Sequence, residues 1–90
     1  MKRRALQVLG ETIRQIRRDR KLTQERLAEL ADVHVNWISM VERGHRNPSA
    51  ISMMYLARAL DVPVAELWKD FDHDRPKLPA KNPARLRGGR

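Results

Sequence analysis

The chain has 90 residues and no cysteine, and it combines 41% hydrophobic with 33% charged residues. This length suits one small folded domain with terminal extensions, and the composition leaves no room for an apolar membrane span of roughly 18 residues. Without cysteine there is no disulfide framework, thiolate zinc site or thiol nucleophile. Met1–Arg4 is followed by a mixed polar stretch and not by the apolar segment of a secretory signal, so we expect a cytoplasmic protein.

Positive charge is concentrated at the two ends of the chain. Nineteen Lys and Arg against eleven Asp and Glu give a net charge of +8. Residues 1–22 carry eight basic and two acidic groups (+6), residues 23–70 five and seven (−2), and residues 71–90 six and two (+4). A basic surface segregated in this way favours a polyanionic partner, of which nucleic acid is the commonest. The alternative is a solubilising surface with a flexible tail.

The first two predicted helices follow a short basic arm, residues 1–5. Apolar residues spaced three or four apart predict an amphipathic helix of about 14 residues, with the stripe Leu6, Leu9, Ile13 and Ile16. A second helix of about eight residues begins at Gln24, because the hydroxyl of Thr23 can cap its first turn. We expect its buried side to contain Leu27, Ala28, Leu30 and Ala31.

Three further helices are predicted, and no segment predicts a strand. Residues 36–43 form the third, with Ile38 and Val41 inside, and Gly44 ends it because glycine readily adopts a left-handed conformation. Ser49 caps the fourth, whose expected apolar positions are Ile51, Met54, Leu56, Ala57 and Leu60. Pro63 suits the start of the fifth, whose apolar positions are Val64, Leu67, Trp68 and Phe71.

Residues 72–90 differ in composition from the rest. They contain Pro76, Pro79 and Pro83, two glycines and few apolar groups. Such a basic tail cannot bury enough surface to offset its chain entropy, so we predict that it is disordered. The run Asp72–His73–Asp74 does not predict a metal site, because three adjacent residues rarely converge on one ion. We expect neither a metal nor another cofactor.

The second and third predicted helices form one unit. Each has about eight residues and is too short to be stable alone, so the two must cross closely and share a core. Close crossing requires a small residue, and Ala28 fits that position while Ile38 and Val41 project back from the other helix. The chain must turn at Asp32.

This unit resembles the phage-repressor (Cro/C1, XRE) helix-turn-helix family. The residues that carry the resemblance are Leu22-Thr23-Gln24-Glu25-Arg26-Leu27-Ala28, Val33, Ile38, Glu42-Arg43-Gly44 and Asn47-Pro48. The resemblance covers about residues 6–70 and implies an all-α, five-helix bundle of the lambda-repressor-like type, usually a homodimer, that binds DNA and regulates transcription. The family most often has glycine where this chain has Asp32, an aspartate that can adopt the left-handed conformation at some cost.

A polar outer face on the second helix of the pair suits the DNA major groove, which is roughly 12 Å wide. In similar repressors the positions matching Val35, Asn36 and Met40 read bases, and the position matching Gln24 braces the site. The Asn36 amide can pair with adenine N6 and N7, whereas Val35 and Met40 can only contact thymine methyls. The predicted base-contacting residues are Gln24, His34, Val35, Asn36, Ser39 and Met40.

Phosphate contacts are expected on both sides of that face. The predicted residues are Thr23, Trp37, Arg43, Arg46 and Asn47. Other roles stay open for some of the base- and phosphate-contacting candidates: Trp37 could fill the core beside Ile38, Met40 could fill a gap, and Arg43 could cap carbonyls of its own helix. His34 could equally be a solvated residue at the helix start. Glu42 is expected to pair with a basic neighbour and not to contact DNA.

The fifth helix is the predicted dimer interface. Val64, Leu67, Trp68 and Phe71 exceed what a small core needs, and such an apolar surface usually marks association. A two-fold dimer would place the two reading helices about 34 Å apart, which matches one turn of DNA and an inverted-repeat operator. The alternative is that Leu67 and Trp68 pack against the first helix.

The sequence therefore predicts a transcriptional regulator that binds double-stranded DNA sequence-specifically as a homodimer, in the cytoplasm on the nucleoid and away from membranes. Phage repressor, restriction–modification controller and antitoxin all fit this description. An antitoxin would use residues 72–90 to hold a protein partner, and a protein-binding adaptor with the same fold also stays open. An enzyme is not expected, because the folded part offers neither a pocket nor paired titratable groups.

Overall fold

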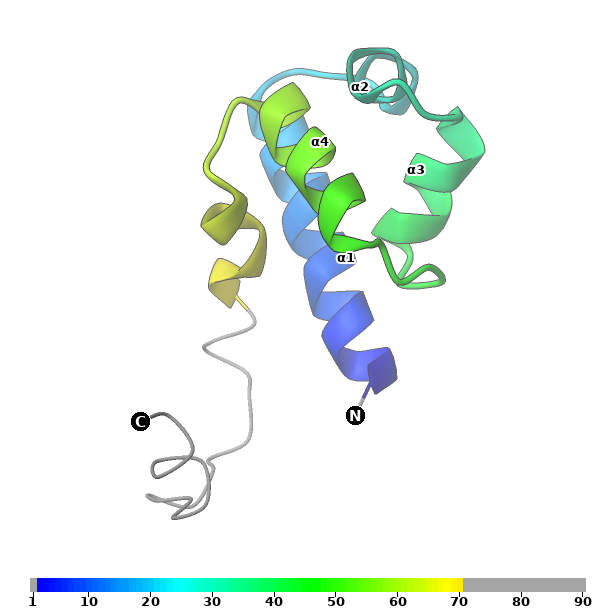
Figure 1. The fold of residues 1–90 in the computed structure, drawn as a ribbon, viewed down its shortest axis with the longest axis vertical. Coiled ribbons are helices and arrows are strands. Elements are labelled where there is room, and N and C mark those ends of the chain that lie inside the picture. Colours follow the sequence, from blue (N-terminus) through cyan, green and yellow to red (C-terminus); the bar gives the residue numbers. More distant parts are fainter. Residues whose placement is uncertain (1, 71–90) are drawn as a thin grey trace.

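The computed structural model describes residues 2–70 of the chain. This part consists of α1 (Lys2–Asp19), α2 (Gln24–Ala31), α3 (Val35–Glu42), α4 (Ala50–Leu60) and the 3₁₀ helix η1 (Val64–Trp68) (Figure 1). No strand occurs among residues 2–70, and the predicted all-α class is confirmed. The predicted Phe71 and the tail, residues 72–90, lie outside the described residues.

The predicted count of five α-helices is wrong, because the fifth helical segment is a 3₁₀ helix of five residues. Pro63 has an extended conformation and precedes η1, as expected of a residue that lacks an N–H donor. The Glu66 N–H donates to the Pro63 carbonyl at 2.9 Å, three residues back along the chain. A segment this short satisfies its backbone groups more readily with the tighter 3₁₀ pattern.

Helix α1 is longer than predicted. It begins at Lys2 and has 18 residues, so residues 2–5 of the predicted arm belong to the helix. Leu9, Ile13 and Ile16 of the predicted stripe are buried, and Leu6 is half-buried. Arg17 lies four residues after Ile13 and is buried on the same side, where a guanidinium needs a partner.

Side-chain hydroxyls cap two of the helices, as predicted. The Thr23 hydroxyl accepts a hydrogen bond from the Arg26 N–H at 3.0 Å, and the Ser49 hydroxyl accepts one from the Ser52 N–H at 3.1 Å. Each bond satisfies a donor that the first turn of a helix leaves without a partner. The two caps fix where α2 and α4 begin.

A left-handed residue follows each of the four α-helices: Lys21 (φ 59°), Asp32 (φ 58°), Gly44 (φ 78°) and Asp61 (φ 60°). In the turn after α2, the Val33 N–H that follows Asp32 donates to the Ala28 carbonyl at 2.9 Å. These bonds satisfy the last carbonyls of a helix and reverse the chain within two residues. The predicted left-handed conformation of Asp32 is confirmed.

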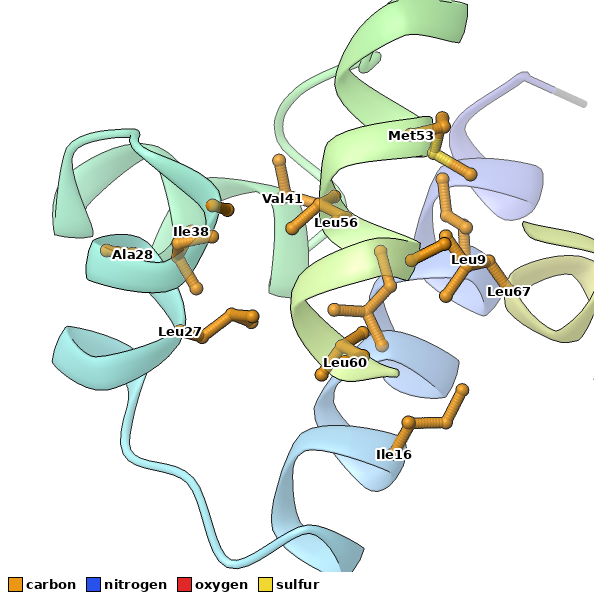
Figure 2. Packing of buried hydrophobic residues seen from close by; sticks show 13 residues of the cluster. Leu9, Ile16, Leu27, Ala28, Ile38, Val41, Met53, Leu56, Leu60 and Leu67 are labelled. Atoms are coloured by element: carbon orange, nitrogen blue, oxygen red, sulfur yellow. The ribbon is translucent and has the colours of Figure 1, made fainter. Parts of the chain in front are cut away.

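A single core holds the helices together. α1 packs against α3 and η1, α2 packs against α3 and α4, and η1 also packs against α4. Figure 2 shows the buried side chains meeting between these helices. The buried hydrophobic residues are Leu9, Ile13, Ile16, Leu27, Ala28, Ala31, Ile38, Val41, Met53, Leu56, Ala57, Leu60 and Leu67.

Three residues that were predicted to be buried are exposed. Leu30 lies outside the face of α2 that Leu27, Ala28 and Ala31 share. Ile51 and Met54 are each 60% exposed, and Met53 takes the inner position of α4 instead. At about 100° per residue, Met53 shares a face with Leu60, whereas Ile51 and Met54 lie on the opposite face.

Candidate nucleic-acid interface

Helices α2 and α3 cross through their inner sides. Leu27 and Ala28 of α2 and Ile38 of α3 are at most 4% exposed and belong to one cluster. Figure 2 shows these three side chains on the facing sides of the two helices. Because Ala28 is small, the helices approach closely, as the sequence predicted. Each helix therefore points its opposite side outward.

The outer face of α3 is open to solvent. Val35 and Asn36 are exposed, as is His34 just before the helix, while Ser39 and Met40 are half-buried. No residue among the described residues 2–70 covers His34, Val35 or Asn36. The starts of α2 and α3 also lie side by side, because Thr23, Arg26, His34 and Val35 line one shallow, open hollow. The structure thus brings the start of α2 next to the predicted base-contacting residues.

The predicted phosphate-contacting residues lie within α3 or in the segments that precede α2 and follow α3. Arg43, Arg46 and Asn47 are exposed in the connector between α3 and α4. The Arg43 guanidinium Nε donates to the Ser39 carbonyl at 3.4 Å, so Arg43 also caps its own helix. Trp37 is half-buried and packs against the core, which supports the structural role that the sequence left open.

A buried ion pair fixes α3 to α1. The Arg17 Nε donates to Glu42 Oε2 at 2.6 Å, and an Arg17 terminal nitrogen donates to Glu42 Oε1 at 3.1 Å. The Arg17 guanidinium also donates to the Leu22 carbonyl at 2.8 Å, in the connector before α2. The predicted pairing of Glu42 with a basic residue is confirmed. Sequence reasoning missed that the partner is Arg17, since 25 positions separate the two residues.

Gln24 belongs to the same network. Its side-chain amide nitrogen donates to Glu42 Oε1 at 3.0 Å. Gln24 is half-buried at the first position of α2, whereas Glu42 is the last residue of α3. The amide of this predicted base-contacting residue is therefore oriented by α3. The ion pair and this bond together set the position of both helices relative to α1.

Two glycines allow α1 to lie against the end of α3, and sequence reasoning missed one of them. A Cβ atom on Gly10 would lie 2.4 Å from the Val41 carbonyl oxygen and 2.5 Å from that of Glu42. A Cβ on Gly44 would lie 3.0 Å from the Cα of Gln7. Only glycine permits these backbone approaches. A glycine inside a predicted helix was the available signal, because it usually has a packing reason there.

The predicted dimer residues divide between core and surface. Leu67 is 0% exposed, so its assignment to the interface is wrong: it packs in the core between α1 and α4. Val64 and Trp68 are exposed, and Phe71 lies outside the described residues. The alternative that this segment packs against α1 holds for Leu67. The Thr12 hydroxyl, which also bonds the Val8 carbonyl, lies 3.0 Å from the Asp70 carboxylate and ties the end of the segment to α1.

None of the helices in the described part of the chain has the length and hydropathy that a bilayer crossing requires. Within residues 2–70, His, Asp and Glu also form no cluster that could hold a metal ion. The Asp72–His73–Asp74 run lies outside the described residues.

A family model described as helix-turn-helix matches residues 13–67, which include α2, α3 and the connectors on both sides. The chain belongs to this helix-turn-helix family. The helix-turn-helix protein is 38% identical over 61 residues to the control protein C.SmaI of Serratia marcescens, a match that covers 68% of this chain and 73% of C.SmaI.

Solved structures agree with the family. The restriction-modification controller protein C.AhdI from Aeromonas hydrophila matches with a TM-score of 0.68 and 39% identity, over 69% of this chain and 94% of that one. A second controller protein, C.Esp1396I, was solved as a tetramer in complex with its natural 35 base-pair operator. It matches with a TM-score of 0.67 and 28% identity, over 72% of this chain and 86% of that one. These relatives are regulators and controller proteins and not enzymes.

Proposed function

We propose that this helix-turn-helix protein is a sequence-specific transcriptional regulator that binds an inverted-repeat operator as a homodimer. In the complex α3 lies in the major groove, with Asn36 as the main base-reading residue and Val35 and Met40 against thymine methyls. The observation that carries this proposal is the outer face of α3. It is polar at its start and open among the described residues, and the buried Arg17–Glu42 pair holds it in place.

Affinity comes from the phosphate contacts around that face. Arg43, Arg46 and Asn47 are exposed beside the end of α3, and Thr23 and Gln24 supply backbone N–H groups at the start of α2. The first three follow the end of α3 and the other two lie near its start, an arrangement that suits the two DNA strands that border a major groove. His34 and Ser39 complete the base-facing set.

The homodimer is supported by two kinds of observation. Val64 and Trp68 of the predicted interface remain exposed on η1. The related controller protein C.Esp1396I binds its operator as a tetramer, so a relative of this fold self-associates on DNA. A cytoplasmic protein on the nucleoid follows from such a function. A protein partner for residues 72–90 has no support among the described residues.

Selection of bound duplexes from a random-sequence DNA pool tests the function. We expect an inverted repeat whose half-sites are centred about 10 base pairs apart, because a two-fold dimer places its two α3 helices one helical turn apart. The selection is performed at about 150 mM salt, where non-specific binding is weak. Recovery of unrelated sequences at this salt would instead favour the protein-binding adaptor.

A further inference from the structure

Helix α4 is apolar on both of its sides. Its inner side consists of Met53, Leu56, Ala57 and Leu60, all buried in the core. Its outer side carries Ile51, Met54 and Tyr55, which are 60%, 60% and 53% exposed. These three residues and the exposed Arg58 are spaced as one stripe of a helix, and we call the three apolar ones the α4 stripe.

The α4 stripe is not explained by the folded monomer. A helix that is apolar all round is normally buried on all sides. In Figure 1, α4 lies in front of α1, and no described element lies in front of α4. Three large apolar side chains that are more than half exposed share this face of the helix, and an exposed apolar patch of this kind is typical of an association site.

The position of the α4 stripe fits a second copy of the chain. Ile51 lies four residues after Asn47 of the predicted phosphate-contacting connector, so the stripe starts beside the DNA-facing side. The stripe spans residues 51–55, and Met54 is its member nearest the middle. Two antiparallel copies of α4 can therefore pack apolar against apolar about a two-fold axis near Met54, with Ile51 of one copy opposite Tyr55 of the other.

Other occupants fit the stripe less well. Residues 71–90 carry six basic and two acidic groups, a charge suited to phosphates and not to an apolar helix face. The DNA backbone offers no apolar surface for Ile51, Met54 and Tyr55. A second copy supplies an identical apolar stripe, and a related controller protein does form a tetramer.

We propose that the α4 stripe is the surface through which two copies of this chain pair, with Met54 nearest the two-fold axis. This proposal rests on the homodimer of the proposed function and names the surface that forms it. Val64 and Trp68 on η1 then lie outside the centre of the interface.

Sedimentation velocity of the full-length protein without DNA tests the proposal. We expect a dimer for the wild type, and we expect Met54→Glu and Tyr55→Glu each to raise the dimer dissociation constant by about 30-fold, the effect of losing an interface hot spot. Both side chains are outside the core, so the thermal unfolding midpoints of the variants and the wild type should be close at concentrations low enough for the wild type also to be monomeric. Leu30→Glu is the matched control, because Leu30 is 45% exposed on α2. It should leave the dissociation constant within about twofold.

Val64→Asp separates the two possible surfaces. If Val64→Asp dissociates the dimer and the Met54 and Tyr55 variants do not, η1 forms the interface and the α4 stripe is refuted. The homodimer itself would then survive. A monomeric wild type over the whole concentration range also refutes the stripe, while the DNA selection still decides the proposed function.

A single introduced thiol gives a geometric test, because the chain has no cysteine of its own. We expect Met54→Cys to form a disulfide-linked dimer quickly under mild oxidation, since two residues beside a two-fold axis come within disulfide reach. Leu30→Cys should cross-link slowly, at the rate of random collisions. Equal rates for the two variants would overturn the proposed axis.

Discussion

The Arg17 guanidinium of α1 and the Glu42 carboxylate of α3 meet side by side inside the protein, through two hydrogen bonds of 2.6 and 3.1 Å. Their side chains are only 10% and 2% exposed. The Leu22 carbonyl and the Gln24 amide satisfy further atoms of the same pair. One buried contact therefore joins the long helix to both helices that form the candidate DNA-binding unit.

Loss of one partner of this pair should be costly. Arg17→Met leaves the Glu42 carboxylate buried without its cation, which typically costs about 3–5 kcal/mol. We expect the free energy of unfolding, measured from urea titrations followed by circular dichroism, to fall by that amount. The double variant Arg17→Met/Glu42→Leu should recover most of the loss, because neither charge remains buried.

The exposed pair Arg26–Glu29 is the control for this experiment. An Arg26 terminal nitrogen lies 2.6 Å from Glu29 Oε1, as close as the Arg17–Glu42 contact, but the two side chains are 56% and 70% exposed. Arg26→Ala should change the free energy of unfolding by no more than about 0.5 kcal/mol. Similar losses for Arg17→Met and Arg26→Ala would show that burial does not decide the strength of the Arg17–Glu42 pair.

Local patterns in the sequence predicted much of the fold. Caps such as Thr23 and the left-handed Asp32 act over a few residues, so the chain near them is sufficient to identify them. Apolar spacing also located α1. It failed for α4, because a helix with apolar residues on both sides does not show which side is the inner one. Ile51 and Met54 were therefore placed in the core. Leu67 of η1 was placed at the dimer interface, although it is buried.

The candidate site was predictable to the same extent. Asn36 and Arg46 occupy positions set by a short motif, and the structure leaves both side chains exposed. The contacts that hold the motif in place join residues far apart in sequence, such as Gly10 with Val41 and Arg17 with Glu42. No local pattern specifies which segments meet, so these contacts can be identified only in the folded structure.

Gly10→Ala should destabilise the protein strongly. The added methyl group would lie 2.4 Å from the Val41 carbonyl oxygen, so α1 and α3 would have to separate. Overpacking costs about 1–3 kcal/mol, and we expect the upper end because the clash is with backbone. The neighbouring Glu11→Ala is the control, since Glu11 is exposed. If urea titrations show that Gly10→Ala is as stable as Glu11→Ala, the close approach of α1 to α3 is wrong.

Asp32→Gly should stabilise the turn between α2 and α3. Asp32 has φ 58° and ψ 49°, a conformation that glycine adopts without strain. We expect Asp32→Gly to be more stable than Asp32→Ala by about 1 kcal/mol, with the natural aspartate between them. Thermal unfolding of the three proteins would check this order. An alanine variant as stable as the glycine variant would mean that the turn has another conformation in solution.

Asn36→Ala should weaken sequence discrimination. The loss of one two-pronged contact with adenine costs about 1–3 kcal/mol at one or two base steps of the selected operator. Binding to duplexes of random sequence should change little, because the phosphate contacts stay intact. Fluorescence anisotropy with both kinds of duplex measures the two affinities. Equal losses on both would remove Asn36 from the base-reading set.

Arg46→Ala should weaken binding to all sequences alike. Arg46 is exposed in the connector that follows α3, where its charge is placed to neutralise a phosphate. If a dimer neutralises five or six phosphates, the logarithm of its affinity falls against the logarithm of salt concentration with a slope of roughly −5, at about −0.9 per phosphate. Removing one such contact per subunit should flatten this slope by about one unit for each half-site. An unchanged slope, with affinity lost only on the selected operator, would show that Arg46 reads bases.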